Sequence, residues 1–167
     1  MGNEVQELTL RAQLVGHTSS VRALATTDAH VFSGSDDSTI RCWDASTLQC
    51  TGVLKGHQDN VRVLATAAAH PHLLFSGSWD KTVHVWDIRA HRCAKVLTGH
   101  TEAVLALAVG SRFLATGSYD RTVRFWDVET LQCVQVGEGH GDAVRVLATV
   151  GDNFASGAYD GSVGIWP

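Results

Sequence analysis

Histidine, serine or threonine, and aspartate recur together in this chain. Such a combination can perform acyl transfer when a hydroxyl nucleophile meets a base and an orienting carboxylate. The sets, each completed by a tryptophan, are His17, Ser33, Asp37 and Trp43; His57, Ser76, Asp80 and Trp86; His100, Thr116, Asp120 and Trp126; and His140, Ser156, Asp160 and Trp166. Catalysis needs one such site, so the repetition argues against a hydrolase. The chain also has neither a G-x-S-x-G elbow nor a Walker-type loop.

A repeated phrase carries three of the four residues of each set. It reads SGSDDSTIRCWD, SGSWDKTVHVWD, TGSYDRTVRFWD and SGAYDGSVGIWP, and the copies begin at Ser33, Ser76, Thr116 and Ser156. Each copy follows a Gly-His pair, and the histidines of successive pairs are 40, 43 and 40 residues apart. Similarity at a fixed period of this length is typical of repeat architectures.

Each repeat contains four strand signals. A short run such as VRALAT follows Gly-His, a second run leads to the Ser/Thr-Gly pair, a period-2 run such as TVHVW follows the Asp, and a last run such as RCAKVL returns to the next Gly-His. Short β-branched and aromatic runs that are broken by Gly, Asp and Ser predict an all-β fold. The second repeat is longer at AAAHPHLL, where Pro71 favours an exposed hairpin loop. A metal site at His70 and His72 would lack an obvious third ligand.

The composition predicts a globular intracellular protein. The 167 residues are 44% hydrophobic and include 13 basic and 17 acidic residues, so neither nucleic acid nor an acidic membrane is a favoured partner. No apolar run reaches the roughly 18 residues of a membrane span, and the N-terminus has no signal-peptide pattern. Cys50, Cys93 and Cys133 occupy one position in successive repeats and Cys42 is alone, so we expect four buried, reduced thiols.

The Gly-His and Trp-Asp units resemble the WD-repeat family of β-propellers, from about Leu8 to Pro167. The resemblance implies four-stranded antiparallel blades that pack face to face around a central channel. It also implies that each His, Ser/Thr, Asp and Trp set is a buried relay, in which Asp accepts from His, His meets the hydroxyl, and the hydroxyl reaches the Trp N–H. The expected divisions are an N-terminal lead 1–7, a closing strand 8–15, and repeats 16–55, 56–98, 99–138 and 139–167.

The blade number raises the question of closure. The fourth repeat stops at Trp166-Pro167, after its third strand, and strand exchange of the kind known in the family would let residues 8–15 supply the missing outer strand. Propellers of this family usually have about seven or eight blades, and an open half-ring would expose two large apolar faces. We expect a homodimer in which two chains close one eight-bladed ring, each N-terminal strand completing the partner's fourth blade. The alternative is that the chain is part of a longer propeller.

The resemblance also predicts the residues of the top face. These are the residues after the first valine of each first strand and the residues before each structural Asp: Arg22, Arg62, Leu105 and Arg145, with Asp36, Trp79, Tyr119 and Tyr159. The arginines are similar to those with which F-box/WD ubiquitin-ligase receptors hold phosphorylated degrons, and Arg offers bidentate donors to phosphate or carboxylate. Those receptors also carry Arg before the Asp, where this chain has aromatics and an acid, and this chain has no F-box. The other interpretation is a solvated rim of arginines.

A second signal is the run Trp86-Asp87-Ile88-Arg89. It matches the WDxR box of WD-repeat receptors that dock on a cullin-RING ligase adaptor, and Asp87 and Arg89 would lie on the opposite, bottom face. We expect a non-enzymatic scaffold whose rigid top face binds peptides, phosphorylated or acidic ones among them. A cullin-RING substrate receptor and a purely structural assembly module are the alternatives. The expected partners are proteins or peptides, with no cofactor, metal ion or small-molecule substrate.

Overall fold

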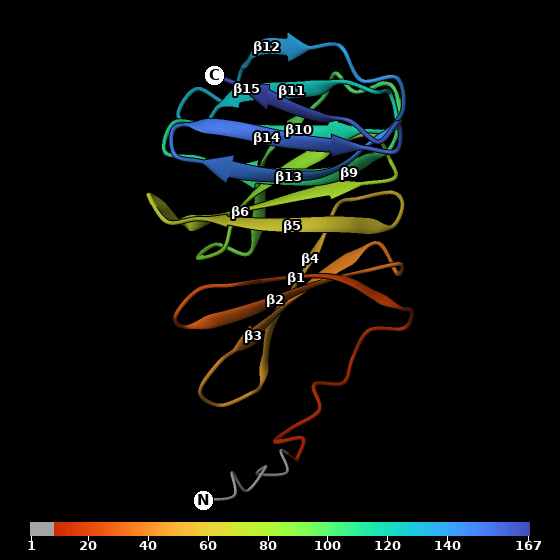
Figure 1. The fold of residues 1–167 in the computed structure, drawn as a ribbon. Helices are drawn as coiled ribbons and strands as arrows, with labels where there is room; N and C mark the ends of the chain where they lie inside the picture. The colour runs from red at the N-terminus through yellow and green to blue at the C-terminus, as the bar shows by residue number, and fades with distance from the viewer. Residues whose placement is uncertain (1–8) are drawn as a thin grey trace, which may run out of the picture.

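A computed structural model describes residues 9–167 as four antiparallel sheets that follow one another along the chain (Figure 1). The first three sheets have four strands each, in sequential order, and the fourth has three. No helix in the described range is long and apolar enough to cross a membrane. The strands are β1 (Val21–Thr26), β2 (His30–Ser35), β3 (Thr39–Asp44), β4 (Cys50–Lys55), β5 (Val61–Ala67), β6 (His70–Ser78), β7 (Val83–Asp87), β8 (Arg92–Leu97), β9 (Val104–Val109), β10 (Phe113–Ser118), β11 (Val123–Asp127), β12 (Cys133–Gly137), β13 (Val144–Val150), β14 (Asn153–Ala158) and β15 (Val163–Trp166).

This arrangement confirms the prediction of an all-β protein built from four propeller blades. We number the blades 1 to 4 in chain order: β1–β4, β5–β8, β9–β12 and β13–β15. The predicted lead 1–7 lies outside the described residues.

The relay aspartate builds the tight turn between the second and third strands of its blade. In blade 1, Asp37 Oδ1 accepts the amide N–H of Thr39 at 2.9 Å and the Thr39 hydroxyl at 2.6 Å. Ser38, between them, has a φ of 65°, a left-handed conformation that is costly for a residue other than glycine. The side-chain bonds of Asp37 hold this turn in place, and the next pair along the hairpin is Gly34 with Ile40.

The apolar core lies between the blades. At the first junction, Phe32, Ile40 and Leu54 of blade 1 pack with Val61 and Trp86 of blade 2. Two further clusters of the same kind lie at the junctions of blades 2 and 3 and of blades 3 and 4. Burial of apolar surface between adjacent sheets therefore stabilises the row of blades, as face-to-face packing predicts.

The two ends of the row differ from its interior. The first strands of the blades lie side by side, with β1 next to β5, β5 next to β9, and β9 next to β13. At one end β15 is the outer edge of its sheet. Residues 9–15 form no strand and lie at the other end of the row, near blade 1 (Figure 1). Residues 9–15 of the closing strand predicted for 8–15 are therefore not paired with β15 within a single chain, and residue 8 lies outside the described range.

Candidate functional site

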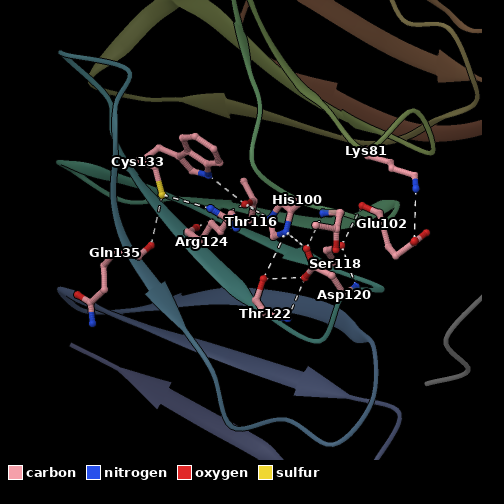
Figure 2. Close-up of polar contacts among 12 residues, drawn as sticks. Lys81, His100, Glu102, Thr116, Ser118, Asp120, Thr122, Arg124, Cys133 and Gln135 are labelled. Carbon is pink, nitrogen blue, oxygen red and sulfur yellow. Dashed lines mark hydrogen bonds and ion pairs between the residues drawn. The ribbon is translucent and has the colours of Figure 1, made fainter.

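The His, Ser/Thr, Asp and Trp sets form hydrogen-bond relays across the blades. In blade 3, His100 Nδ1 lies 2.7 Å from Asp120 Oδ2, and His100 Nε2 lies 2.7 Å from Thr116 Oγ1 (Figure 2). Trp126 Nε1 donates to the same hydroxyl at 3.0 Å, and the hydroxyl of Thr122 donates to Asp120 at 2.6 Å. The relay thus joins the loop before β9 to strands β10 and β11 and to the turn between them.

The relays of blades 1 and 2 repeat this geometry, whereas that of blade 4 is altered. In blades 1 and 2 the His–Asp and His–Ser distances are 2.7–2.8 Å. In blade 4, His140 Nδ1 lies 2.8 Å from Ser162 Oγ and 3.5 Å from Asp160 Oδ2. His140 Nε2 and Ser156 Oγ remain bonded at 2.6 Å. The blade that lacks its outer strand therefore keeps the imidazole–hydroxyl bond but has a looser His–Asp contact.

One assignment of protons satisfies every group of a relay. If His100 carries its proton on Nδ1, it donates to Asp120, accepts the Thr116 hydroxyl proton on Nε2, and leaves that hydroxyl to accept from Trp126. Burial raises the pKa of Asp120, but hydrogen bonds from His100 and Thr122 lower it by more, so its pKa lies well below the ordinary value. Thr116 is fully buried, which leaves its hydroxyl no access to a substrate.

The predicted top-face residues of the first strands share a backbone feature, because each lies at an irregularity of its strand. In blade 1, Val21 pairs with Ser35 and Ala23 with Gly34, so Arg22 is the extra residue of a β-bulge. The residues at the same register shift in the other blades are Arg62, Leu105 and Arg145. A bulge turns a side chain away from its regular direction, and here it does so at the starting edge of every inner strand.

These four residues line one cavity of about 400 Å³, together with neighbouring residues of the four inner strands. The arginines do not share one environment. Arg22 is bound to Asp36, with Nε and Nη2 at 2.7 Å and 2.5 Å from Oδ2. The hydrogen bond from Arg22 is the main reason that the pKa of Asp36 is lowered, and the charge of Arg62 adds to it. Among the described residues, neither Arg62 nor Arg145 forms an ion pair.

The residues before the structural aspartates lie along the same edge. Their backbone amides donate to the carbonyl of the residue that directly precedes each first strand, as Trp79 N–H does to Asn60 O at 3.1 Å and Tyr119 N–H to Ala103 O at 3.0 Å. Trp79 and Tyr119 form an edge-to-face pair with ring centroids 6.0 Å apart, and Tyr159 is exposed. Exposed aromatics beside the arginine cavity can anchor a peptide.

Leu105 departs from its predicted exposure. It lines the cavity, but its side chain is buried and packs with Ala103 and Ala143. An apolar side chain at the bulge gains by turning into the junction between blades 3 and 4, where a charged arginine would stay near water. The expected exposure of Leu105 is therefore wrong, although the residue still lines the cavity.

The opposite edge of the sheets carries the WDxR residues. Arg89 is exposed, and its Nε lies 3.4 Å from Asp87 Oδ1. Arg89 also lines a cavity of about 600 Å³ between blades 1 and 2, whose other members include His30, His72 and His91. The sequence predicts none of this grouping, because the three histidines come from three different loops or strand ends with no common spacing.

The sequence also does not predict the position of His84, a histidine outside the relays. Its ring stacks on His57 with centroids 3.8 Å apart, and its Nδ1 lies 3.7 Å from Cys93 Sγ. His57, Asp80 and His84 place their polar atoms close enough to share a metal ion. However, His57 already bonds Asp80 and Ser76, each at 2.7 Å, so a metal ion there would break the relay. The grouping fits buried packing better than a metal centre. Alignment of the repeats gives the one usable signal, since Arg41 and Arg124 stand at the position of His84.

The four cysteines are free thiols, but their burial differs from the prediction. Cys42 is buried, and burial raises the pKa of its thiol to about 12. Cys93 is half-buried, whereas Cys50 and Cys133 are exposed. The expectation of burial is wrong for these two, because they begin the outer strands β4 and β12, whose side chains are mostly exposed.

Comparison with known proteins identifies the repeats. The family described as "WD domain, G-beta repeat" matches residues 8–44, 48–87, 91–127 and 131–167. The matches to curated relatives are short and span only 8% to 14% of those proteins. One of them is the "Probable E3 ubiquitin ligase complex SCF subunit sconB" of Aspergillus terreus, which is 47% identical over 51 residues, or 29% of this chain and 8% of that protein.

Solved structures extend the similarity to most of the chain. The computationally designed Ika4 protein is 36% identical with a TM-score of 0.85, and the match covers 92% of this chain and 94% of that chain. The structure of U3-55K is 29% identical with a TM-score of 0.86, and the match covers 92% of this chain and 50% of that chain. The same blade arrangement thus occurs both in a chain of similar length and in one about twice as long.

Proposed function

Because the chain belongs to the WD-repeat family, whose repeat it carries four times, we propose that it is a non-enzymatic scaffold whose top face binds peptides bearing phosphate or clustered carboxylates. The observation that carries this proposal is the cavity at the start of the inner strands. Arg62 and Arg145 line it without intramolecular ion pairs among the described residues, and the pair of Trp79 and Tyr119 lies along the same edge. Guanidinium groups supply bidentate donors to an anion, and aromatic rings supply apolar contact area.

The rigidity of the scaffold supports binding without chemistry. The relays fix the loops that carry the top-face residues, so little conformational entropy is lost when a peptide binds. The relay hydroxyls that would be the nucleophiles of a hydrolase are buried and already bonded to Trp and His. We propose an intracellular location as well, since the thiols are free and two of them are exposed.

A peptide-binding assay with a charge reversal tests this function. Peptides with one phosphoserine or phosphothreonine would be screened by fluorescence anisotropy, each beside its unphosphorylated and glutamate-substituted forms. Arg62→Glu should lower the affinity for every peptide that binds the wild-type chain. Arg112→Glu is the matched control, because Arg112 is an exposed arginine paired with Asp127 at the opposite edge of the sheets. If Arg62→Glu leaves every affinity unchanged, the top face is not the binding site.

A cullin-RING substrate receptor is the second candidate function. The exposed Arg89 of the WDxR run favours it, and so does the local similarity to a protein described as an SCF subunit. In this alternative Asp87 and Arg89 contact an adaptor at the bottom edge, while the top face holds the substrate peptide. A purely structural assembly module is the third possibility, and it predicts no peptide binding at either edge.

We also propose that two copies of the chain close one eight-bladed ring as a homodimer. The three-stranded fourth blade and the unpaired residues 9–15 of the same chain support this arrangement. Strand exchange between the copies would complete both fourth blades, and two-fold symmetry would follow from the identity of the chains. The expected products are four-stranded blades throughout, in which β15 is no longer the outer edge of its sheet.

A further inference from the structure

Blade 4 exposes an apolar face that the other blades bury. Ile40, Val83 and Val123 occupy one position of the third strand, and all three are 0–1% exposed, whereas Val163 at the same position is 74% exposed. Two residues further on, Ile165 is 64% exposed, although its counterparts in blades 1 to 3 are buried. These side chains lie on the face that packs against the following blade, and the described chain supplies no following blade.

Blade 1 exposes the complementary half of the same junction. Val61, Val104 and Val144 open the first strands of blades 2 to 4, and each is 0% exposed because it packs against the preceding blade. Val21 holds this position in blade 1 and is 51% exposed. Leu24, three residues further on, is 65% exposed. The two ends of the row therefore present the two halves of a contact that the chain makes three times internally.

A glycine in the second strand of each blade makes room for a valine of the next blade. A Cβ atom at Gly34, Gly77 or Gly117 would lie only 2.6–2.7 Å from a Cγ1 atom of the first valine of the next blade. Only glycine leaves room for that valine. We call the space above each glycine a socket, and the valine of the next blade fills it. Gly157 is the fourth socket, and the side chain nearest to its Cβ direction is Val146 of its own blade. No valine of a following blade fills this socket in the described chain.

We propose that a second copy of this chain fills it, with Val21 of each copy packed on Gly157 of the other and with Leu24 against Val163 and Ile165. This inference rests on the proposed two-chain ring and names the surface that closes it. The partner is a second copy because the exposed halves complement each other residue by residue in the manner of the three internal junctions. The same junction would form twice, once at each meeting of blade 4 with blade 1.

The N-terminal segment has residues suited to the same surface. Leu14 lies three residues before His17, and the residues three before His57 and His100 are Leu54 and Leu97, which are buried in the outer strands β4 and β8. In the described chain Leu14 is half-buried, and its neighbours Leu10 and Val15 are exposed. If this segment pairs with β15 of the other copy, it becomes the outer strand of that copy's fourth blade. Leu14 would then lie over the junction between that fourth blade and Val21 of its own chain.

Solution mass measured over a range of concentrations tests the proposal. The wild-type chain should have twice its 17.9 kDa mass in light scattering after size exclusion. Val21→Asp and Val163→Asp should each weaken dimerisation by at least about 100-fold, or about 2.7 kcal/mol, since each places a charge in the centre of an apolar contact. Both side chains are more than half exposed in the single chain, so each change removes little packing from within it. Val96→Asp is the control, because Val96 is 41% exposed on β8, between two occupied junctions.

The possible outcomes distinguish the proposed contact between Val21 and Gly157 from the proposed two-chain ring. A folded wild-type monomer at all concentrations overturns both, and so does an open-ended assembly of higher mass. A dimer that survives both aspartate variants overturns the junction but leaves the two-chain ring. Weakening by Val96→Asp to the same extent also overturns it, since the effect would then not belong to the open faces. Circular dichroism of each monomeric variant checks that the blades remain folded, and peptide binding by such a monomer is measured independently.

Discussion

His84 stacks on His57 with a distance of 3.8 Å between ring centroids, so a second imidazole covers the relay histidine of blade 2. Blades 1 and 3 place Arg41 and Arg124 at the corresponding position. Burial and, to a smaller extent, the charge of His57 lower the pKa of His84 to about 4, while Asp80 acts in the opposite direction. A neutral imidazole therefore packs where two other blades accommodate a permanent cation.

This stacking predicts a dependence of stability on pH. The ordinary pKa of histidine is 6.5 and that of His84 in the folded chain is about 4, so between these values the unfolded chain binds more protons than the folded one. The stability that depends on neutral His84 should be fully present above pH 6.5. The free energy of unfolding should then fall by about 3 kcal/mol as the pH decreases towards 4. Urea unfolding curves across this range, at one protein concentration, measure the decrease.

His84→Arg provides the comparison, because it installs the residue of blades 1 and 3 and cannot titrate in this range. The variant should lose most of the slope between pH 6.5 and 4. Below pH 4 both proteins should lose stability, since the relay carboxyls such as Asp80 have lowered pKa values and become protonated there. A slope that is unchanged in the variant would assign the pH dependence to other groups.

The relay hydroxyl of blade 3 gives a second prediction. Thr116→Val keeps the shape of the side chain but leaves the Trp126 N–H and His100 Nε2 without their partner in a buried site. The free energy of unfolding should fall by about 3 kcal/mol, because unsatisfied buried groups cost about 1–3 kcal/mol each. Thr116→Ser is the matched control, since serine holds this position in the other three blades. Equal destabilisation by both variants would point to lost packing of the methyl group instead.

The ion pair of Arg22 with Asp36 leads to a third prediction, a gain of binding. Asp36→Asn removes the carboxylate that holds the Arg22 guanidinium and leaves three arginines free to face an anionic peptide. Affinity for phosphopeptides should rise roughly fivefold at low salt, the factor that corresponds to one exposed ion pair. The gain should disappear at about 1 M salt, where screening acts within a few ångströms. Weaker binding by Asp36→Asn would show that Asp36 positions Arg22 for the ligand.

Arg89 at the bottom edge supports a fourth prediction. Arg89→Ala removes an exposed side chain whose only described ion pair is with Asp87 at 3.4 Å, so the folding stability should change by less than about 1 kcal/mol. If the chain docks on a cullin-RING adaptor, capture by purified adaptor should be lost in this variant, and top-face peptide binding should be retained. Absence of adaptor binding by the wild-type chain would remove the receptor function from consideration.

The relays and the blade order could be predicted from the sequence because both depend on residues at fixed spacing. The His, Ser/Thr, Asp and Trp set recurs in all four repeats, and its hydrogen bonds satisfy buried groups in the same way in blades 1 to 3. In blade 4 the His–Asp contact is looser. The four inner-strand residues of the predicted top face also meet in one cavity, because the same bulge recurs in every first strand.

Only the tertiary structure decided what differs between equivalent positions. Equivalent residues meet different neighbours: Arg22 meets Asp36, whereas Arg62 remains free, and Leu105 turns into a junction that the three arginines avoid. Val163 and Val83 are the same residue at the same position, yet one is exposed and the other buried, because the described residues place a blade after blade 2 and none after blade 4. Repetition in the sequence determines the hydrogen bonds within a blade, whereas burial and charge pairing depend on which surfaces lie next to that blade in space.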